Sequence, residues 1–212
     1  KANPGKPATL EDINGQIYQT AYNDALSASG FGTGGQYQQA IQAATAAVQG
    51  LAGSDLSAAL AGGAAPYVAE VISHYSGLND AGKVAAHAVV NAALAAAQGQ
   101  KALAGAAGAA TGELVGMIAT EMYGKSADEL DETQKQTVSA LATLAAGLSG
   151  GLVGDSSASA VAGAQAGKTT VENNYLSQKQ QSQRDKEIAE CQTLACKAGA
   201  QAKWTAIDLG QD

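Results

Sequence analysis

The sequence is poor in the large side chains that usually anchor a hydrophobic core. Aromatic residues make up 4% of the chain, with one Trp and one Phe, although hydrophobic residues reach 46%. Most of that share is alanine. Because each buried alanine removes little apolar surface from water, such a core needs many helix contacts rather than a few large anchors.

Clustered basic residues are also missing. The net charge of −7 falls entirely on residues 1–174, because the acidic and basic residues after them balance. Nucleic acids are bound chiefly through Lys and Arg on their phosphates, so we expect no nucleic-acid binding by this chain. His74 and His87 have no cysteine near them in sequence, which argues against a zinc site. We expect no metal, no cofactor and no enzyme with repeated turnover.

Proline is scarce, with 3 residues, and no segment shows the alternation typical of strands. Apolar residues recur instead at helical spacing. The pattern predicts helices at 9–28, 36–52, 55–62, 64–76, 80–98, 101–123, 131–149 and 156–172, with Pro66 in a first helical turn. The expected fold is all-α: a compact multi-helix bundle rich in Ala and Gly, with an extended C-terminal helical appendage.

Glycine, by contrast, is abundant and recurs in four-residue steps. Gly108, Gly112 and Gly116 form one such ladder, and shorter steps recur at 147–151 and 163–167. A face of glycines lets a second backbone approach closely. Two interpretations remain open: tight packing within a small-residue bundle, or a bundle that opens and makes transient contact with a membrane. The uncharged run 136–154 has membrane-spanning length, but its polar residues and glycines disfavour a permanent transmembrane helix.

The two cysteines, Cys191 and Cys196, lie five residues apart near the end of the chain. This spacing suits a bond within one helix poorly, so their cross-link requires a break in the helix between them. They could instead pair with sequence outside this fragment.

One tetrapeptide carries a resemblance to a known family. Residues 171–174 read Val-Glu-Asn-Asn and are followed by Tyr-Leu-Ser. They come after a Gly/Ala-rich region that contains Met-Tyr-Gly-Lys at 122–125 and Leu-Ala-Ala-Gly-Leu-Ser-Gly-Gly at 144–151. Residues 36–176 resemble the pretoxin segment of contact-dependent growth inhibition effectors (CdiA-type, filamentous haemagglutinin-like), in which this motif marks the boundary to a variable toxin region.

The resemblance implies three parts: a linker and N-terminal helix at 1–35, a pretoxin domain at 36–174, and the start of a truncated toxin or recipient-cell import region at 175–212. It implies a secreted bacterial surface protein, present at the cell surface or in the periplasm during delivery, whose toxin region enters a target cell. The implied partners are the remainder of the effector filament, an immunity protein and envelope proteins of the recipient. The residues after Asn174 are too few for a compact nuclease, so we expect the toxic domain to lie outside this fragment and infer no toxin activity from it.

Asparagine also brings a chemistry of its own to the junction. Its side-chain amide can attack its own backbone carbonyl, and attack at Asn174 would release Tyr175 as a new N-terminus. We expect a single-turnover self-cleavage at Asn174, with Asn173 as the alternative nucleophile and Glu172 beside them. An amide nitrogen is a weak nucleophile and needs a base.

The base must be brought to the junction by the fold, and the candidates are His74, His87 and Asp155. Two other interpretations stay open. The asparagines could merely form hydrogen bonds at a helix end in a structural spacer that does not cleave. The bundle could also insert into a membrane and form a pore.

Overall fold

The computed structural model describes residues 8–175, 188, 191, 193 and 196–200, except the side chains of residues 73–75, 128 and 175. Within these residues every regular element is a helix, which confirms the all-α prediction. The elements are α1 (Leu10–Ala28), α2 (Gln36–Ala52), α3 (Leu56–Tyr75), α4 (Asp80–Ala97), α5 (Ala102–Tyr123), η1 (Ala127–Glu129), α6 (Glu132–Gly154), α7 (Ser157–Thr170) and η2 (Val171–Tyr175).

Short polar side chains set the helix starts. Thr9 and Asp131 each close a capping box, with Asp12 and Gln134 as the reciprocal partners. Asp55, Asn79 and Ser156 each accept a hydrogen bond from a backbone amide of the first turn. These caps satisfy amide groups that have no partner inside the helix.

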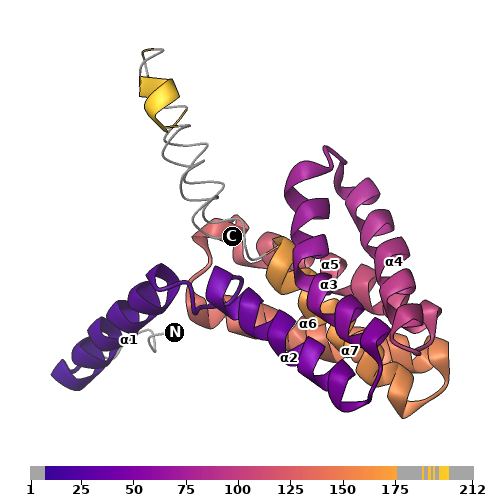
Figure 1. Cartoon of the computed structure of the whole chain (residues 1–212). Coiled ribbons are helices and arrows are strands. Elements are labelled where there is room, and N and C mark those ends of the chain that lie inside the picture. The colour runs from indigo at the N-terminus through magenta and orange to yellow at the C-terminus, as the bar shows by residue number, and fades with distance from the viewer. Residues whose placement is uncertain (1–7, 176–187, 189–190, 192, 194–195, 201–212) are drawn as a thin grey trace.

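The centre of the bundle consists of α5, α6 and α7, which pack more extensively on one another than any other helices do. The α2–α3 hairpin lies along one side, and α4 packs on α5 (Figure 1). The core consists mostly of alanine, and Ala104, Ala109, Ala142 and Ala146 are fully buried.

Glycine allows the central helices to approach to backbone contact. A Cβ atom added at Gly108 would lie 2.2 Å from the Gly163 carbonyl oxygen, and one added at Gly112 would lie 2.4 Å from that of Gly167. The two pairs follow the same order along both helices, so α5 and α7 run in the same direction. No residue with a side chain fits at these contacts without moving the helices apart.

The structure corrects two of the helix boundaries expected from sequence. Residues 56–75 form one continuous helix with Pro66 inside it, rather than two helices that meet before the proline. Packing of α3 between α2 and α4 carries the helix across a residue that would end an isolated one. Helix α6 also continues to Gly154, past the predicted end at residue 149.

Helix α1 extends away from the bundle and has no buried residue (Figure 1). The loop that follows it is fixed by Glu132 at the start of α6. The Glu132 carboxylate, which is 2% exposed, accepts hydrogen bonds from the Thr33 amide at 2.9 Å and from the Thr33 hydroxyl at 2.7 Å. These bonds fix where α2 begins.

We predict that Gly108→Ala lowers the free energy of unfolding by at least 1–3 kcal/mol, because the new methyl group would overlap backbone atoms of α7. Gly15→Ala on α1 is the matched control. Its Cβ would meet nothing within 4 Å, so the substitution should be neutral or stabilising by up to about 1 kcal/mol. Urea unfolding followed by circular dichroism measures both. Equal stability of the two variants would contradict the close-packing argument.

Candidate functional site at the Val-Glu-Asn-Asn turn

The Val-Glu-Asn-Asn motif forms a π-helical turn at the end of α7 and lies in the interior of the bundle. Val171, Glu172, Asn173 and Asn174 are each at most 3% exposed. Burying a charge and two amides is unfavourable unless they have polar partners. The turn directs its three polar side chains to three different sets of partners.

Asn174 faces α4 and α5. Its Nδ2 donates a hydrogen bond to a carboxylate oxygen of Glu113, which is 3% exposed. The fully buried His87 lies beside both groups: its Nε2 is 3.9 Å from the same oxygen, Glu113 Oε2, and its imidazole interacts with the Asn174 side chain. The fold thus brings an amide, a carboxylate and an imidazole from three separate elements into one enclosed site.

Burial shifts the two titratable groups of this site toward their neutral forms. It raises the pKa of the Glu113 carboxyl to about 6, against the opposing effects of the hydrogen bond from Asn174 and the positive charge of Lys83. It lowers the pKa of the His87 imidazole to about 4, and the interaction with the Asn174 side chain opposes part of that shift. At neutral pH the site therefore holds a carboxylate and an uncharged imidazole.

Glu172 points to a second polar cluster, made by α2, α6 and α7. Lys168 Nζ lies 2.7 Å from its Oε2, and Gln38 Nε2 donates to the same oxygen at 3.0 Å. Gln42 and Ser139 donate to the carboxylate as well. With four donors, Glu172 is held away from Asn174 and joins the turn to its neighbouring helices.

Asn173 has a third set of partners. Its Nδ2 donates to Gln42 Oε1 at 2.9 Å and to the Thr169 carbonyl oxygen at 3.0 Å. Gln42 therefore contacts two of the four residues of the motif.

Of the three bases expected from sequence, the structure brings His87 to Asn174. Asp155 is exposed at the end of α6, and the whole of α7 separates it from the turn, which is about 20 Å along the helix. The side chain of His74 lies outside the described residues. Cys191 and Cys196 are joined in a disulfide in this structure, with no helix at Cys191 and helical conformation at Cys196.

Glu113 is a residue of the site that was not predicted from the sequence, although a signal was present. It is the one charged residue between Lys101 and Glu121, in a helix otherwise built of small and apolar residues. A charge at a position surrounded by Ala and Gly indicates either an exposed face or a buried polar site. Only the packing of α4 and the turn against α5 shows that it is buried.

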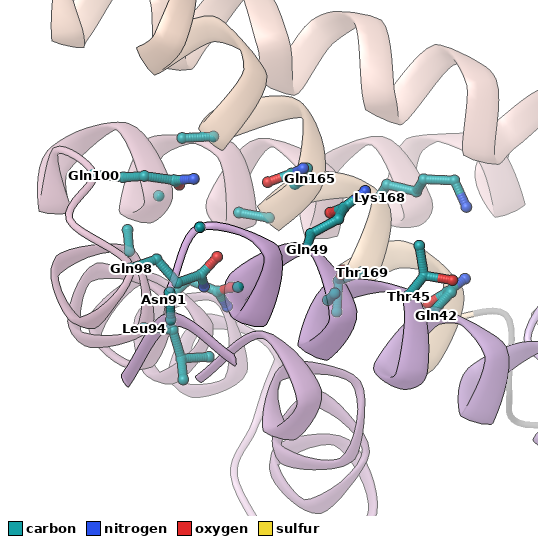
Figure 2. Close-up of a pocket in the computed structure, with 18 of the residues that line it drawn as sticks. Gln42, Thr45, Gln49, Asn91, Leu94, Gln98, Gln100, Gln165, Lys168 and Thr169 are labelled. Carbon is teal, nitrogen blue, oxygen red and sulfur yellow. The ribbon is translucent and has the colours of Figure 1, made fainter. Parts of the chain in front are cut away.

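A pocket of about 630 Å³ lies beside the turn, between α2, α4 and α7. Amide side chains make up most of its polar lining (Figure 2). Gln42, Lys168 and Thr169, which also line it, are partners of Glu172 and Asn173 in the turn. Among the residues that the structure describes, no group of three or more His, Cys, Asp or Glu could hold a metal ion.

We predict that the free energy of unfolding of Glu113→Gln, relative to that of the wild type, increases as the pH rises. The pKa of Glu113 in the folded state lies above its unfolded value of 4.5. The stability that Glu113 contributes to the wild type is therefore fully present below pH 4.5 and is lost as the pH rises through about 6. The free energy of unfolding of the variant, relative to wild type, should rise by about 2 kcal/mol between pH 4.5 and 7. Urea titrations at several pH values test this, and a difference independent of pH would contradict it.

Comparison with known proteins places the turn in a family. Residues 127–178 match the pre-toxin domain with VENN motif, which covers α6, α7 and the turn. The chain is 59% identical over 191 residues to "Deoxyribonuclease CdiA" of Yersinia pseudotuberculosis, covering 90% of this chain and 18% of that protein. It is 61% identical over 148 residues to "Toxin CdiA" of Yersinia pestis, covering 70% of this chain and 4% of that protein.

A third relative is "tRNA nuclease CdiA" of Escherichia coli strain STEC_O31, which is 54% identical over 149 residues. This match covers 69% of this chain and 4% of that protein. The chain thus spans less than a fifth of the length of these relatives. No solved structure matches it. On the family match and these identities, the chain belongs to the CdiA-type contact-dependent inhibition effectors and contains their pre-toxin domain with VENN motif.

Proposed function

We propose that this domain cleaves its own chain after Asn174 and thereby releases the toxin region that follows. One observation carries the proposal: the Nδ2 of Asn174 donates to the carboxylate of Glu113 inside a closed site. The atom that must attack is thus in contact with a group able to take its proton.

The reaction balances within the chain. Asn174 Nδ2 attacks the backbone carbonyl carbon of Asn174 and gives one proton to Glu113. The bond from that carbon to the nitrogen of Tyr175 breaks, and the nitrogen takes up a proton to become a new N-terminal amine. The other product ends in a succinimide at Asn174, and no water is consumed.

The environment of Glu113 suits a general base. A base is most effective when its pKa lies near the working pH, and burial raises that of Glu113 to about 6. The uncharged His87 has one N–H donor and one acceptor nitrogen, which suits it to orient the Asn174 amide. Exclusion of water strengthens both interactions.

Cleavage after Asn174 would free the region that follows the turn, as delivery of a toxin requires. The relatives are named as a deoxyribonuclease, a toxin and a tRNA nuclease. The match to the deoxyribonuclease covers 191 residues, more than the 174 that end at Asn174, so that similarity continues past the turn. We infer that the complete protein is a secreted surface filament that carries a nuclease region after the turn, needs an immunity protein, and uses envelope proteins of the recipient cell.

Intact-mass spectrometry of the purified chain tests the cleavage. We predict fragments that meet at Asn174 and Tyr175, whose masses add up to that of the uncut chain because cyclisation consumes no water. Asn174→Ala should not be cut. Glu113→Gln should be cut about 10²–10⁴-fold more slowly, because it keeps an acceptor and loses the base.

In the wild type the rate should rise with pH through about 6, as Glu113 loses its proton. A cut whose fragments together carry one extra water from the outset would indicate hydrolysis by a protease. An uncut chain at every pH would favour a structural spacer.

Exposed leucines on α6 favour membrane contact as a second candidate function. Helices α5 and α6 are long and apolar enough to cross a membrane, although core helices of water-soluble proteins pass the same criterion. Although α6 packs in the centre of the bundle, its outer face carries a row of exposed leucines, Leu141, Leu144, Leu148 and Leu152, whose members are 56–84% exposed. Their spacing places them along one face. Such a row could bind a bilayer surface.

If this row contacts lipid, we predict that the chain releases dye from phospholipid vesicles. Leu144→Ser with Leu148→Ser should then reduce release at least severalfold, since both side chains are more than two-thirds exposed and lie outside the folded core. Leu10→Ser with Ile17→Ser on α1 serves as the matched control. A chain that neither sediments with the vesicles nor releases their dye would exclude this candidate.

A further inference from the structure

The motif offers two adjacent asparagines, both buried in the same turn, and this inference concerns the choice between them. It rests on the proposed self-cleavage. Asn173 and Asn174 carry the same side chain and are equally enclosed, each 1% exposed. The two side chains are therefore equivalent as nucleophiles, and the groups that hold each amide distinguish them.

The two groups that accept hydrogen bonds from the Asn173 side-chain amide cannot act as a base. A side-chain amide nitrogen has two N–H groups, and those of Asn173 point to the Gln42 side-chain oxygen at 2.9 Å and the Thr169 carbonyl oxygen at 3.0 Å. Both acceptors are neutral amide oxygens, which do not take up a proton near neutral pH. Asn174 has the Glu113 carboxylate at the corresponding nitrogen.

Glu172 fixes the orientation of Gln42. The Gln42 Nε2 donates to the Glu172 carboxylate while its Oε1 accepts from Asn173. Reversing the Gln42 amide would place its oxygen against that carboxylate and its NH₂ group against that of Asn173, so neither bond could form. Glu172 is itself held by Lys168 at 2.7 Å and by Gln38 at 3.0 Å.

We propose that Gln42, oriented by Glu172, selects the cleavage site: it holds the Asn173 amide on a neutral acceptor and so restricts cyclisation to Asn174. Gln42 is a positioning residue on α2, 131 residues before Asn173 in sequence. The Glu of the motif then acts through Gln42 rather than on the cleaved bond.

Exchanging the two side chains tests this directly. In the double variant Gln42→Glu with Glu172→Gln, the carboxylate moves onto Asn173, while the net charge and the number of polar groups stay the same. We expect a second cut, after Asn173, that leaves Asn174 as the N-terminus of the tail. Intact mass resolves the two tails because they differ by one asparagine residue. Gln49→Glu, which places a carboxylate on α2 in the same pocket away from the turn, is the matched control.

Combining the exchange with Asn174→Ala isolates the second site. Asn174→Ala alone should remain uncut, and the triple variant should be cut after Asn173 only. Circular dichroism verifies that each variant is folded. If the exchange prevents folding, Gln42→Ala provides a second measurement: the side-chain amide protons of Asn173, observed by NMR, should exchange with solvent at least tenfold faster than in the wild type.

The outcomes separate this inference from the proposed function. A wild-type chain that is never cut refutes the self-cleavage. A wild type cut after Asn174, together with a folded exchange variant that is cut there alone, refutes the selection by Gln42. Unchanged exchange of the Asn173 amide in Gln42→Ala does so as well.

Discussion

The contact between α5 and α7 is the constraint on which the rest of this structure depends. Gly108 and Gly112 lie against the backbone of Gly163 and Gly167, so the two helices run side by side at the distance of main-chain contact. This approach fixes where α7 ends and therefore where the Val-Glu-Asn-Asn turn enters the bundle. Glu113 directly follows Gly112 in α5, so the same contact brings the carboxylate to the turn.

A core of small side chains has a further consequence for the polar turn. Alanine contributes little free energy by burial, so a buried charge without a partner would be tolerated poorly in such a bundle. Glu172 is accordingly surrounded by donors from three helices, and Asn173 bridges α2 and α7. Removing one member of such a network costs more than the bond itself, because the remaining partners are left buried. The turn therefore also serves as a junction between helices.

The turn has two polar environments, one around Asn174 and one around Glu172 and Asn173. On the side of α4 and α5, a carboxylate and an imidazole with opposite shifts of pKa surround Asn174. On the side of α2 and α6, neutral amides and an ion pair surround Glu172 and Asn173. Adjacent residues of a helical turn point in different directions, so a four-residue motif can meet both environments at once.

The sequence by itself determined the helical class, most helix boundaries and the place of the motif, because apolar periodicity, capping residues and the Val-Glu-Asn-Asn signature are local. It did not determine the continuity of α3 across Pro66, since packing outweighs the preference of one residue. Nor could it select His87 over Asp155 or reveal Glu113 and Gln42, which lie 61 and 131 residues from their partners in the turn. Those choices were made by tertiary structure, because helix packing alone decides which distant side chains share one buried site.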